Sequence, residues 1–183
     1  MRSGKSGSVC ADTRDHGCMR DWVVGGALIL SDDGVLLVQN RRRNGSHDWT
    51  PPGGVIDEGE TLLAGLTREV EEETGLRVTE WAGPVYEVRC EAPDLGWRLR
   101  VEAHVAVAYE GELHVDDPDG IVVDARFVDV DACNGLVAGG HPWVCEPLGE
   151  WLAERWPHHE SRPYGFHVAG AVADEVIVTR QDR

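Results

Sequence analysis

The chain has 183 residues, of which 42% are hydrophobic, and this suits one domain with a sizeable core and short extensions. Its formal net charge of −16 argues against general nucleic-acid binding, which needs a basic face. No apolar run reaches the length of a membrane span, the longest being Trp22–Leu30, so no membrane insertion is expected.

The N-terminal stretch Met1–Asp21 is polar and rich in Gly and Ser, and it lacks a hydrophobic signal core. We therefore expect residues 1–20 to form a flexible tail and the protein to be cytoplasmic. The five cysteines form no Cys-x-x-Cys pair, and an odd number without a framework favours reduced thiols.

Two strands are predicted first, over Trp22–Leu30 and Val35–Gln39, because these apolar runs flank the turn-forming Ser31–Gly34. The basic run Arg41-Arg42-Arg43 follows and could bind phosphate in an otherwise acidic chain, although a solvated loop is the alternative. The candidate substrate-binding residues are Arg41, Arg43 and Trp49.

A loop and a helix are predicted next. Pro51-Pro52-Gly53-Gly54 breaks regular structure and lets backbone approach a ligand closely. Thr61 suits the N-cap of the helix, and Gly75 suits a left-handed C-terminal cap. Between them lies an apolar stripe formed by Leu62, Leu63, Leu66 and Val70.

Three carboxylates, those of Glu69, Glu72 and Glu73, are spaced i, i+3, i+4 and so share one face of this helix. Like charges at this spacing cost about 0.2–0.5 kcal/mol per pair in an isolated helix. Clustered hard oxygen ligands suit Mg²⁺ or Mn²⁺, so these residues are candidate metal ligands. Arg68 precedes them and could hold Glu60 or Glu69 in position. A solvated acidic helix is the alternative, but the glycines and Arg68 fit a metal site better.

Beyond the helix, strands are predicted over Val78–Arg89, with an interruption at Gly83-Pro84, over Arg98–Tyr109 and over Ile121–Val130. Trp143–Trp156 has the apolar spacing of an amphipathic helix. Strands mixed with two helices, without strict alternation, predict a mixed sheet between helices.

The last segment, His158–Arg183, has strand character in Tyr164–Val168 and Glu175–Thr179. Three readings stay open for it: a hairpin, a dimer arm or a disordered segment.

The segment Gly54–Leu76 resembles the Nudix box, the signature of the Nudix hydrolases. The family pattern is Gly, five residues, Glu, seven residues, then Arg-Glu-aliphatic-x-Glu-Glu-x-Gly-aliphatic. The chain fills it without departure at Gly54, Glu60, Arg68, Glu69, Val70, Glu72, Glu73, Gly75 and Leu76. Trp49–Gly54 is similar to the family's Trp-x-x-Pro-Gly-Gly lead-in. The resemblance covers residues 21–157 and implies an α/β fold, an α/β/α sandwich with a mixed β-sheet, followed by an extension over 158–183.

The resemblance also implies the chemistry. The protein is expected to be a metal-dependent hydrolase with Mg²⁺ or Mn²⁺ as cofactor, cleaving the diphosphate linkage of a nucleoside diphosphate joined to another group. The implied metal ligands are Glu69, Glu72, Glu73 and the carbonyl oxygen of Gly54, with Glu69, Glu72 and Arg68 as catalytic residues of the box.

In this family a further catalytic carboxylate lies on a loop after the central strands. Here that region is Val115–Gly120, followed by Asp124. Asp119 and Asp117 are the candidates, and a solvated acidic turn is the alternative.

The box does not specify the substrate. The short domain favours a nucleoside triphosphate, intact or oxidised, which would give a nucleoside monophosphate and pyrophosphate. Pro93 lies close to where ADP-ribose-cleaving members carry a proline, so an ADP-ribose or nucleotide-sugar pyrophosphatase is the alternative, although Pro93–Gly96 also suits an ordinary turn. Trp97 or Tyr86 could stack on a base, with core packing as the alternative.

Two readings outside catalysis of this kind are a non-catalytic nucleotide-sensing Nudix domain and an isoprenoid diphosphate isomerase. The intact box argues against both. The expected partner is a small-molecule nucleotide, with no nucleic acid and no membrane, and the protein is expected to be a monomer or a homodimer.

Overall fold

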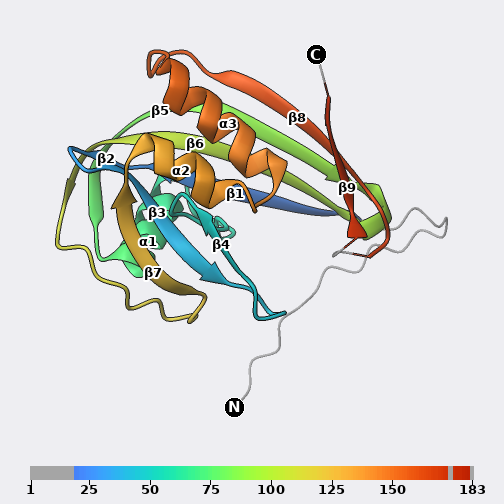
Figure 1. The fold of residues 1–183 in the computed structure, drawn as a ribbon, viewed down its shortest axis with the longest axis horizontal. Helices are drawn as coiled ribbons and strands as arrows, with labels where there is room; N and C mark the ends of the chain where they lie inside the picture. The colour runs from blue at the N-terminus through green and yellow to red at the C-terminus, as the bar shows by residue number, and fades with distance from the viewer. Residues whose placement is uncertain (1–18, 173–174, 182–183) are drawn as a thin grey trace.

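The computed structural model describes residues 19–172 and 175–181, which form two β-sheets and three α-helices (Figure 1). Residues 1–18 of the predicted flexible tail lie outside the described residues. Within the described ranges, no helix is long and apolar enough to cross a bilayer.

The larger sheet has five strands in the order β1, β6, β5, β8, β9. Their bounds are β1 Arg20–Leu28, β5 Arg77–Ala92, β6 Trp97–Glu110, β8 Arg162–Ala169 and β9 Ile177–Gln181. The pairs β1–β6 and β5–β8 are parallel, whereas β5–β6 and β8–β9 are antiparallel. The sheet is therefore mixed, as the sequence predicts.

The smaller sheet is built around β3 (Gly34–Arg41). One edge of β3 pairs with β2 (Leu30–Ser31) and then with β4 (His47–Thr50), and the other edge pairs with β7 (Val122–Val128). All of these pairings are antiparallel. The sheet thereby holds the end of β3 next to the loop that precedes β7.

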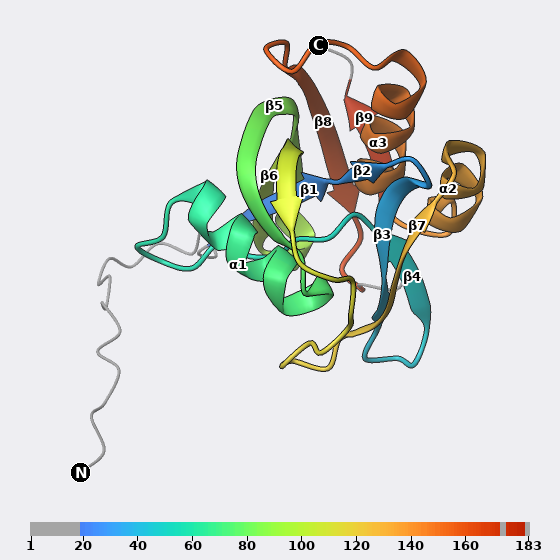
Figure 2. The ribbon, with the colours of Figure 1, turned by 90° about the vertical axis from the view of Figure 1, so that its left-hand side faces the viewer.

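Helices cover both faces of the larger sheet, as Figure 2 shows for α1 (Leu62–Thr74) and α3 (Pro142–Glu154). Successive residues of a strand point to opposite faces, and the two core clusters follow this rule. Leu28 packs in the cluster of α3 with Trp151, while its neighbour Ala27 packs in the cluster of α1 with Leu66. The α/β/α sandwich expected from the resemblance is confirmed.

Helix α1 begins and ends where the sequence predicts. Thr61 is the N-cap and its side chain accepts a hydrogen bond from the backbone N–H of Ala64, while Gly75 closes the helix with φ of 70°. Leu66 and Val70 are fully buried, but Leu63 of the predicted apolar stripe is 38% exposed. The helix lies so close to β1 that a Cβ at Gly25 would be 3.1 Å from Leu66 Cβ.

Two elements were not predicted: strand β4 and helix α2 (Val130–Val137). The strand expected over Ile121–Val130 ends at Val128, because Asp129 caps α2 by accepting a hydrogen bond from Ala132 N at 2.9 Å. A short 3₁₀ turn, η1 (Pro93–Leu95), connects β5 to β6.

The segment beyond residue 157 forms a hairpin of β8 and β9, one of the three readings left open by the sequence. Strand β8 also pairs with β5 and buries Tyr164, Phe166 and Val168 in the core. The division at residue 157 stays a prediction, since β8 shares both its hydrogen bonds and its core with the segment before it.

We predict that truncation after Pro157 destabilises the protein severely. Burial of each large apolar side chain contributes about 1.5–3 kcal/mol, and β8 supplies Tyr164, Phe166 and Val168 to the core. The melting temperature should therefore fall by at least ~10 °C in a thermal melt. Truncation after Gly170, which keeps β8 and removes the more exposed β9, is the control and should cost less. A protein cut after Pro157 that melts within ~2 °C of the full chain would contradict this account.

Candidate active site

The turn before α1 lies against strand β1. The Gly25 N–H donates to Gly54 O at 3.0 Å, and the Ala27 N–H donates to Pro52 O at 2.8 Å. Gly53 has φ of 136° and a Cβ there would collide with the carbonyl oxygen of Gly25, so only glycine fits. A Cβ on Gly54 would collide with the carboxylate of Glu69. The turn and α1 are therefore in direct contact.

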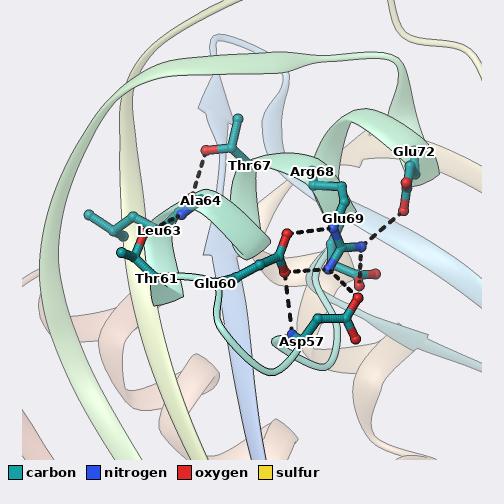
Figure 3. A network of polar contacts seen from close by, with 9 residues as sticks. All are labelled: Asp57, Glu60, Thr61, Leu63, Ala64, Thr67, Arg68, Glu69 and Glu72. Atoms are coloured by element: carbon teal, nitrogen blue, oxygen red, sulfur yellow. Dashed lines mark hydrogen bonds and ion pairs between the residues drawn. The ribbon is translucent and has the colours of Figure 1, made fainter. Parts of the chain in front are cut away.

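Arg68 lies at the centre of an ion-pair network (Figure 3). Its Nε and Nη2 donate to the two carboxylate oxygens of Glu60 at 3.1 and 2.9 Å. Its Nη1 donates to Glu69 at 2.8 Å and to Glu72 at 3.2 Å. These hydrogen bonds raise the pKa of Arg68 and lower the pKa of Glu60. The prediction that Arg68 holds Glu60 or Glu69 agrees with this geometry. Arg68 also bonds Glu72, which was not predicted.

Glu73 lies on the buried side of this cluster and points into the protein. Only 9% of the residue is exposed, and one carboxylate oxygen accepts the Gly53 N–H at 2.8 Å. Burial raises the pKa of Glu73 to about 8. Burial also raises the pKa of Glu69, against the opposing effect of Arg68. The fold thus buries a carboxylate beside two others with no cation paired to Glu73 among residues 19–172 and 175–181.

These residues fit a divalent cation. Their metal-binding atoms are hard oxygens. A cation would reduce the repulsion between the carboxylates of Glu69 and Glu73, and it would offset the cost of burying a charge on Glu73. In the described ranges no three acidic, His or Cys side chains already surround one point, and Glu69 and Glu72 bond to Arg68. The Gly54 carbonyl oxygen, the fourth expected ligand, accepts the Gly25 N–H and retains a second lone pair.

The loop before β7 carries the two aspartates expected to approach the box. Asp119 is among the groups that raise the pKa of Glu69, and Asp117 is among those that raise the pKa of Glu73, so the loop lies near α1. The Asp117 carboxylate accepts the N–H groups of Ile121 and Val122 at 2.7 and 2.8 Å. It therefore shapes the loop.

The Asp119 side chain is exposed and makes no side-chain hydrogen bond within the described residues. Its backbone N–H is held by Asp117 at 3.2 Å. The Arg41 guanidinium donates to Gly120 O at 3.0 Å, and the Arg41 N–H donates to Ile121 O at 2.8 Å. Arg41, expected to bind substrate, thus anchors the loop that presents Asp119.

The other two candidate substrate-binding residues lie elsewhere. Trp49 is 7% exposed, packs in the core, and lies 4.5 Å beneath the guanidinium of Arg126. Arg43 lies at the exposed turn between β3 and β4. Neither shares a hydrogen bond or ion pair with the box carboxylates in the parts of the chain that the structure describes. Their roles in substrate binding stay predictions.

Next to the box turn is a cleft of about 170 Å³ that was not predicted from the sequence. Gly53, Thr50 and Pro51 line it next to the box, and Leu99 of β6 and Trp143 of α3 line it as well. Tyr86 also lines it, although only 5% of Tyr86 is exposed, and Trp97 packs edge-on to Trp143 at 6.3 Å. We call this the apolar cleft. Periodicity assigned Trp143 to a helix but could not show that the ring borders a cavity.

Comparison with known proteins agrees with the resemblance. A family model described as NUDIX domain matches residues 19–146, more than half of the chain. A MutT-like protein of Streptomyces ambofaciens is 47% identical over 51 residues, which is 28% of this chain and 32% of that protein. The chain therefore matches only about a third of this curated relative's length.

Solved structures share the fold. A MutT protein from Bacillus halodurans has a TM-score of 0.63 at 22% identity, covering 87% of this chain and 97% of that chain. A MutT NUDIX hydrolase from Burkholderia pseudomallei has a TM-score of 0.54 at 28% identity, covering 61% of this chain and 85% of that chain.

The buried carboxylate of Glu73 predicts a pH dependence of stability in the metal-free protein. Its pKa in the folded state, about 8, lies above the ordinary value of 4.5, so the folded state binds the proton more tightly. The stability that this proton contributes is complete below pH 4.5 and is lost as the pH rises through about 8. In EDTA at about pH 9, Glu73→Gln should therefore melt several degrees above the unmodified protein, with little difference at about pH 4.

The matched control is Glu71→Gln, at an exposed position on the same helix, which should leave the pH profile unchanged. A Glu73→Gln protein that melts below the unmodified protein at high pH would show that the buried charge is compensated.

Proposed function

The chain belongs to the Nudix family, and from that membership we propose that it hydrolyses the diphosphate linkage of a nucleoside diphosphate joined to another group. The observation that carries the proposal is the pairing of Arg68 with Glu60, Glu69 and Glu72 beside the buried Glu73. An acidic cluster of this kind would repel a diphosphate unless a cation lay between them.

Glu69, Glu72, Glu73 and the carbonyl oxygen of Gly54 would hold Mg²⁺ or Mn²⁺. Such an ion, when bound, neutralises phosphate charge and lowers the pKa of a bound water. Arg68 bonds both Glu69 and Glu72, and the Glu69 carboxylate lies against Gly54 of the turn. We assign to Asp119 the acceptance of a proton from the attacking water, since its carboxylate is exposed and its loop is anchored by Arg41.

The apolar cleft would bind the organic group attached to the diphosphate. It meets the box at Gly53, because the Gly53 N–H bonds Glu73 of the box while Gly53 also lines the cleft. Trp143 offers a half-buried aromatic ring on which a base could stack. Within this class we favour a nucleoside triphosphate, intact or oxidised, cleaved to a nucleoside monophosphate and pyrophosphate.

ADP-ribose or a nucleotide sugar is the second candidate substrate. Its basis is Pro93, the first residue of η1, which connects β5 to β6. A cytoplasmic location and a monomeric or homodimeric state stay predictions. A panel of nucleoside triphosphates, oxidised nucleotides, ADP-ribose, NADH, dinucleoside polyphosphates and nucleotide sugars, each with Mg²⁺, separates these substrates from a nucleotide-sensing domain that hydrolyses none.

We predict that Glu72→Gln abolishes most of the turnover. The side chain is 41% exposed, so the fold should survive the loss of one charge. Loss of a ligand to the catalytic ion should cost several kcal/mol of barrier, and each ~1.4 kcal/mol is tenfold in rate. The rate on the best substrate of the panel should fall at least about a hundredfold. Glu71→Gln is the control, and near-normal turnover by folded Glu72→Gln, or full activity in excess EDTA, would contradict the proposal.

Asp119 and Asp117 should differ in how their loss acts. Asp119→Asn should lower kcat more than it raises KM, as expected for a group that acts in the transition state. Asp117→Asn should instead lower the melting temperature, because its carboxylate accepts the N–H groups of Ile121 and Val122. Steady-state kinetics and thermal melts of the two variants test this division. Full kcat in Asp119→Asn would remove this residue from the mechanism.

A further inference from the structure

A second cleft, of about 560 Å³, lies between the β3–β4 turn and the connection from α2 to α3. We call it the hairpin cleft. Its residues are 42–44 and 46–48 on one side and 139–141 on the other. In contrast to the apolar cleft, it is lined by charged and polar side chains, including Arg42, Arg43 and His141.

The turn that presents these arginines is held by its own hydrogen bonds. The Gly45 N–H donates to Arg42 O at 2.9 Å, and the Arg42 N–H donates to Ser46 O at 2.8 Å. Asn44 Oδ1 accepts from the N–H and the hydroxyl of Ser46 at 2.9 and 2.7 Å. Arg43 therefore starts from a fixed backbone position, which reduces the entropy lost when its side chain binds a ligand.

The hairpin cleft carries an uncompensated positive charge. The Arg42 guanidinium bonds Asp48 Oδ2 through Nε at 2.9 Å and Nη2 at 2.7 Å, so this pair is neutral. Arg43 is exposed and, within residues 19–172 and 175–181, has no carboxylate within ion-pair distance. Since the whole chain has a net charge of −16, a free guanidinium bordering a cavity marks a place where an anion would be favoured.

The hairpin cleft adjoins the apolar cleft. The rings of His141, in the hairpin cleft, and Trp143, in the apolar cleft, are stacked with centroids 4.0 Å apart and planes at 11°. Strand β4 links the clefts a second time, since Asp48 lines one and Thr50 the other, about 7 Å apart along the strand. The box carboxylates, the apolar cleft and the hairpin cleft therefore follow one another across this side of the molecule.

We propose that the hairpin cleft binds an additional phosphate on the substrate, remote from the cleaved diphosphate, with Arg43 as its main ligand. This inference rests on the proposed function and adds to its substrates nucleotides whose organic group carries a further phosphate. A guanidinium suits this task because its N–H groups match phosphate oxygens in pairs. The stacked His141 and Trp143 form the wall along which the organic group passes from one cleft to the other.

The test compares substrates that differ by one remote phosphate: coenzyme A against 3′-dephospho-coenzyme A, and NADPH against NADH. The unmodified protein should show kcat/KM about tenfold or more higher for the phosphorylated member of at least one pair, the range expected for a charge-assisted hydrogen bond. Arg43→Gln should bring that ratio toward one, and Arg43→Lys should restore part of it. The control Arg89→Gln, an exposed arginine on β5 outside both clefts, should keep the ratio.

A second pair of variants places a charge in the cleft. A Cβ added at Gly139 would meet no atom within 4 Å, so a side chain there is tolerated. Gly139→Glu should repel the remote phosphate and lower the ratio, whereas Gly139→Gln, of the same shape, should keep it.

Binding to the metal-free protein makes the test independent of hydrolysis. By calorimetry, adenosine 3′,5′-bisphosphate or 2′,5′-bisphosphate should bind more tightly than AMP, and Arg43→Gln should remove the difference. If this holds but no substrate is hydrolysed, the proposed function is wrong and the phosphate site stands. The inference is overturned if neither bisphosphate binds better than AMP, if the substrate pairs are hydrolysed without a preference, or if Arg43→Gln keeps the preference.

Discussion

The guanidinium of Arg68 is the interaction on which the rest of the site depends. It bonds both oxygens of Glu60, which ties the loop before α1 to the helix, and it bridges Glu69 and Glu72 on the next turn. Without this cation, the carboxylates on one helix face would repel one another. Glu73 lies outside the network and holds only the Gly53 N–H, in a buried position that raises its pKa. The single positive charge of Arg68 is shared among three carboxylates, and Glu73 has no cation paired to it within the described residues, so the site keeps an excess of negative charge that a divalent cation suits.

The two sheets bring other segments to this helix. Strand β1 holds the Pro51–Gly54 turn through two backbone hydrogen bonds, so the glycines face α1. Strand β3 pairs with β4 on one edge and β7 on the other, which places the Arg41 guanidinium on the loop that carries Asp119. The turn that follows Arg41, between β3 and β4, presents Arg43. Strand β3 thus leads both to the loop that carries Asp119 and to the hairpin cleft.

The box could be predicted in detail because its signals are local. Thr61 and Gly75 mark the ends of α1 through their own capping chemistry, and the spacing of Glu69, Glu72 and Glu73 fixes their common face. Strand β4 could not be predicted, because a run of four residues, His47–Thr50, is too short to show alternation. The clefts were missed for a different reason. They form where Trp143 and His141 meet residues far away in the chain, and periodicity shows only that α3 is amphipathic. Trp49 was selected as a substrate-binding candidate from its place in a family-like motif. The motif does not show that the ring packs in the core.

The central claim is that these carboxylates serve the cleavage of a diphosphate linkage. It is tested most directly by the position of isotope after hydrolysis of a nucleoside triphosphate with Mg²⁺ in ¹⁸O-labelled water. The account predicts that mass spectrometry finds one ¹⁸O in the nucleoside monophosphate or in the pyrophosphate, and none in orthophosphate. Labelled orthophosphate released from the triphosphate would show that the outer bond is cleaved and would contradict the account.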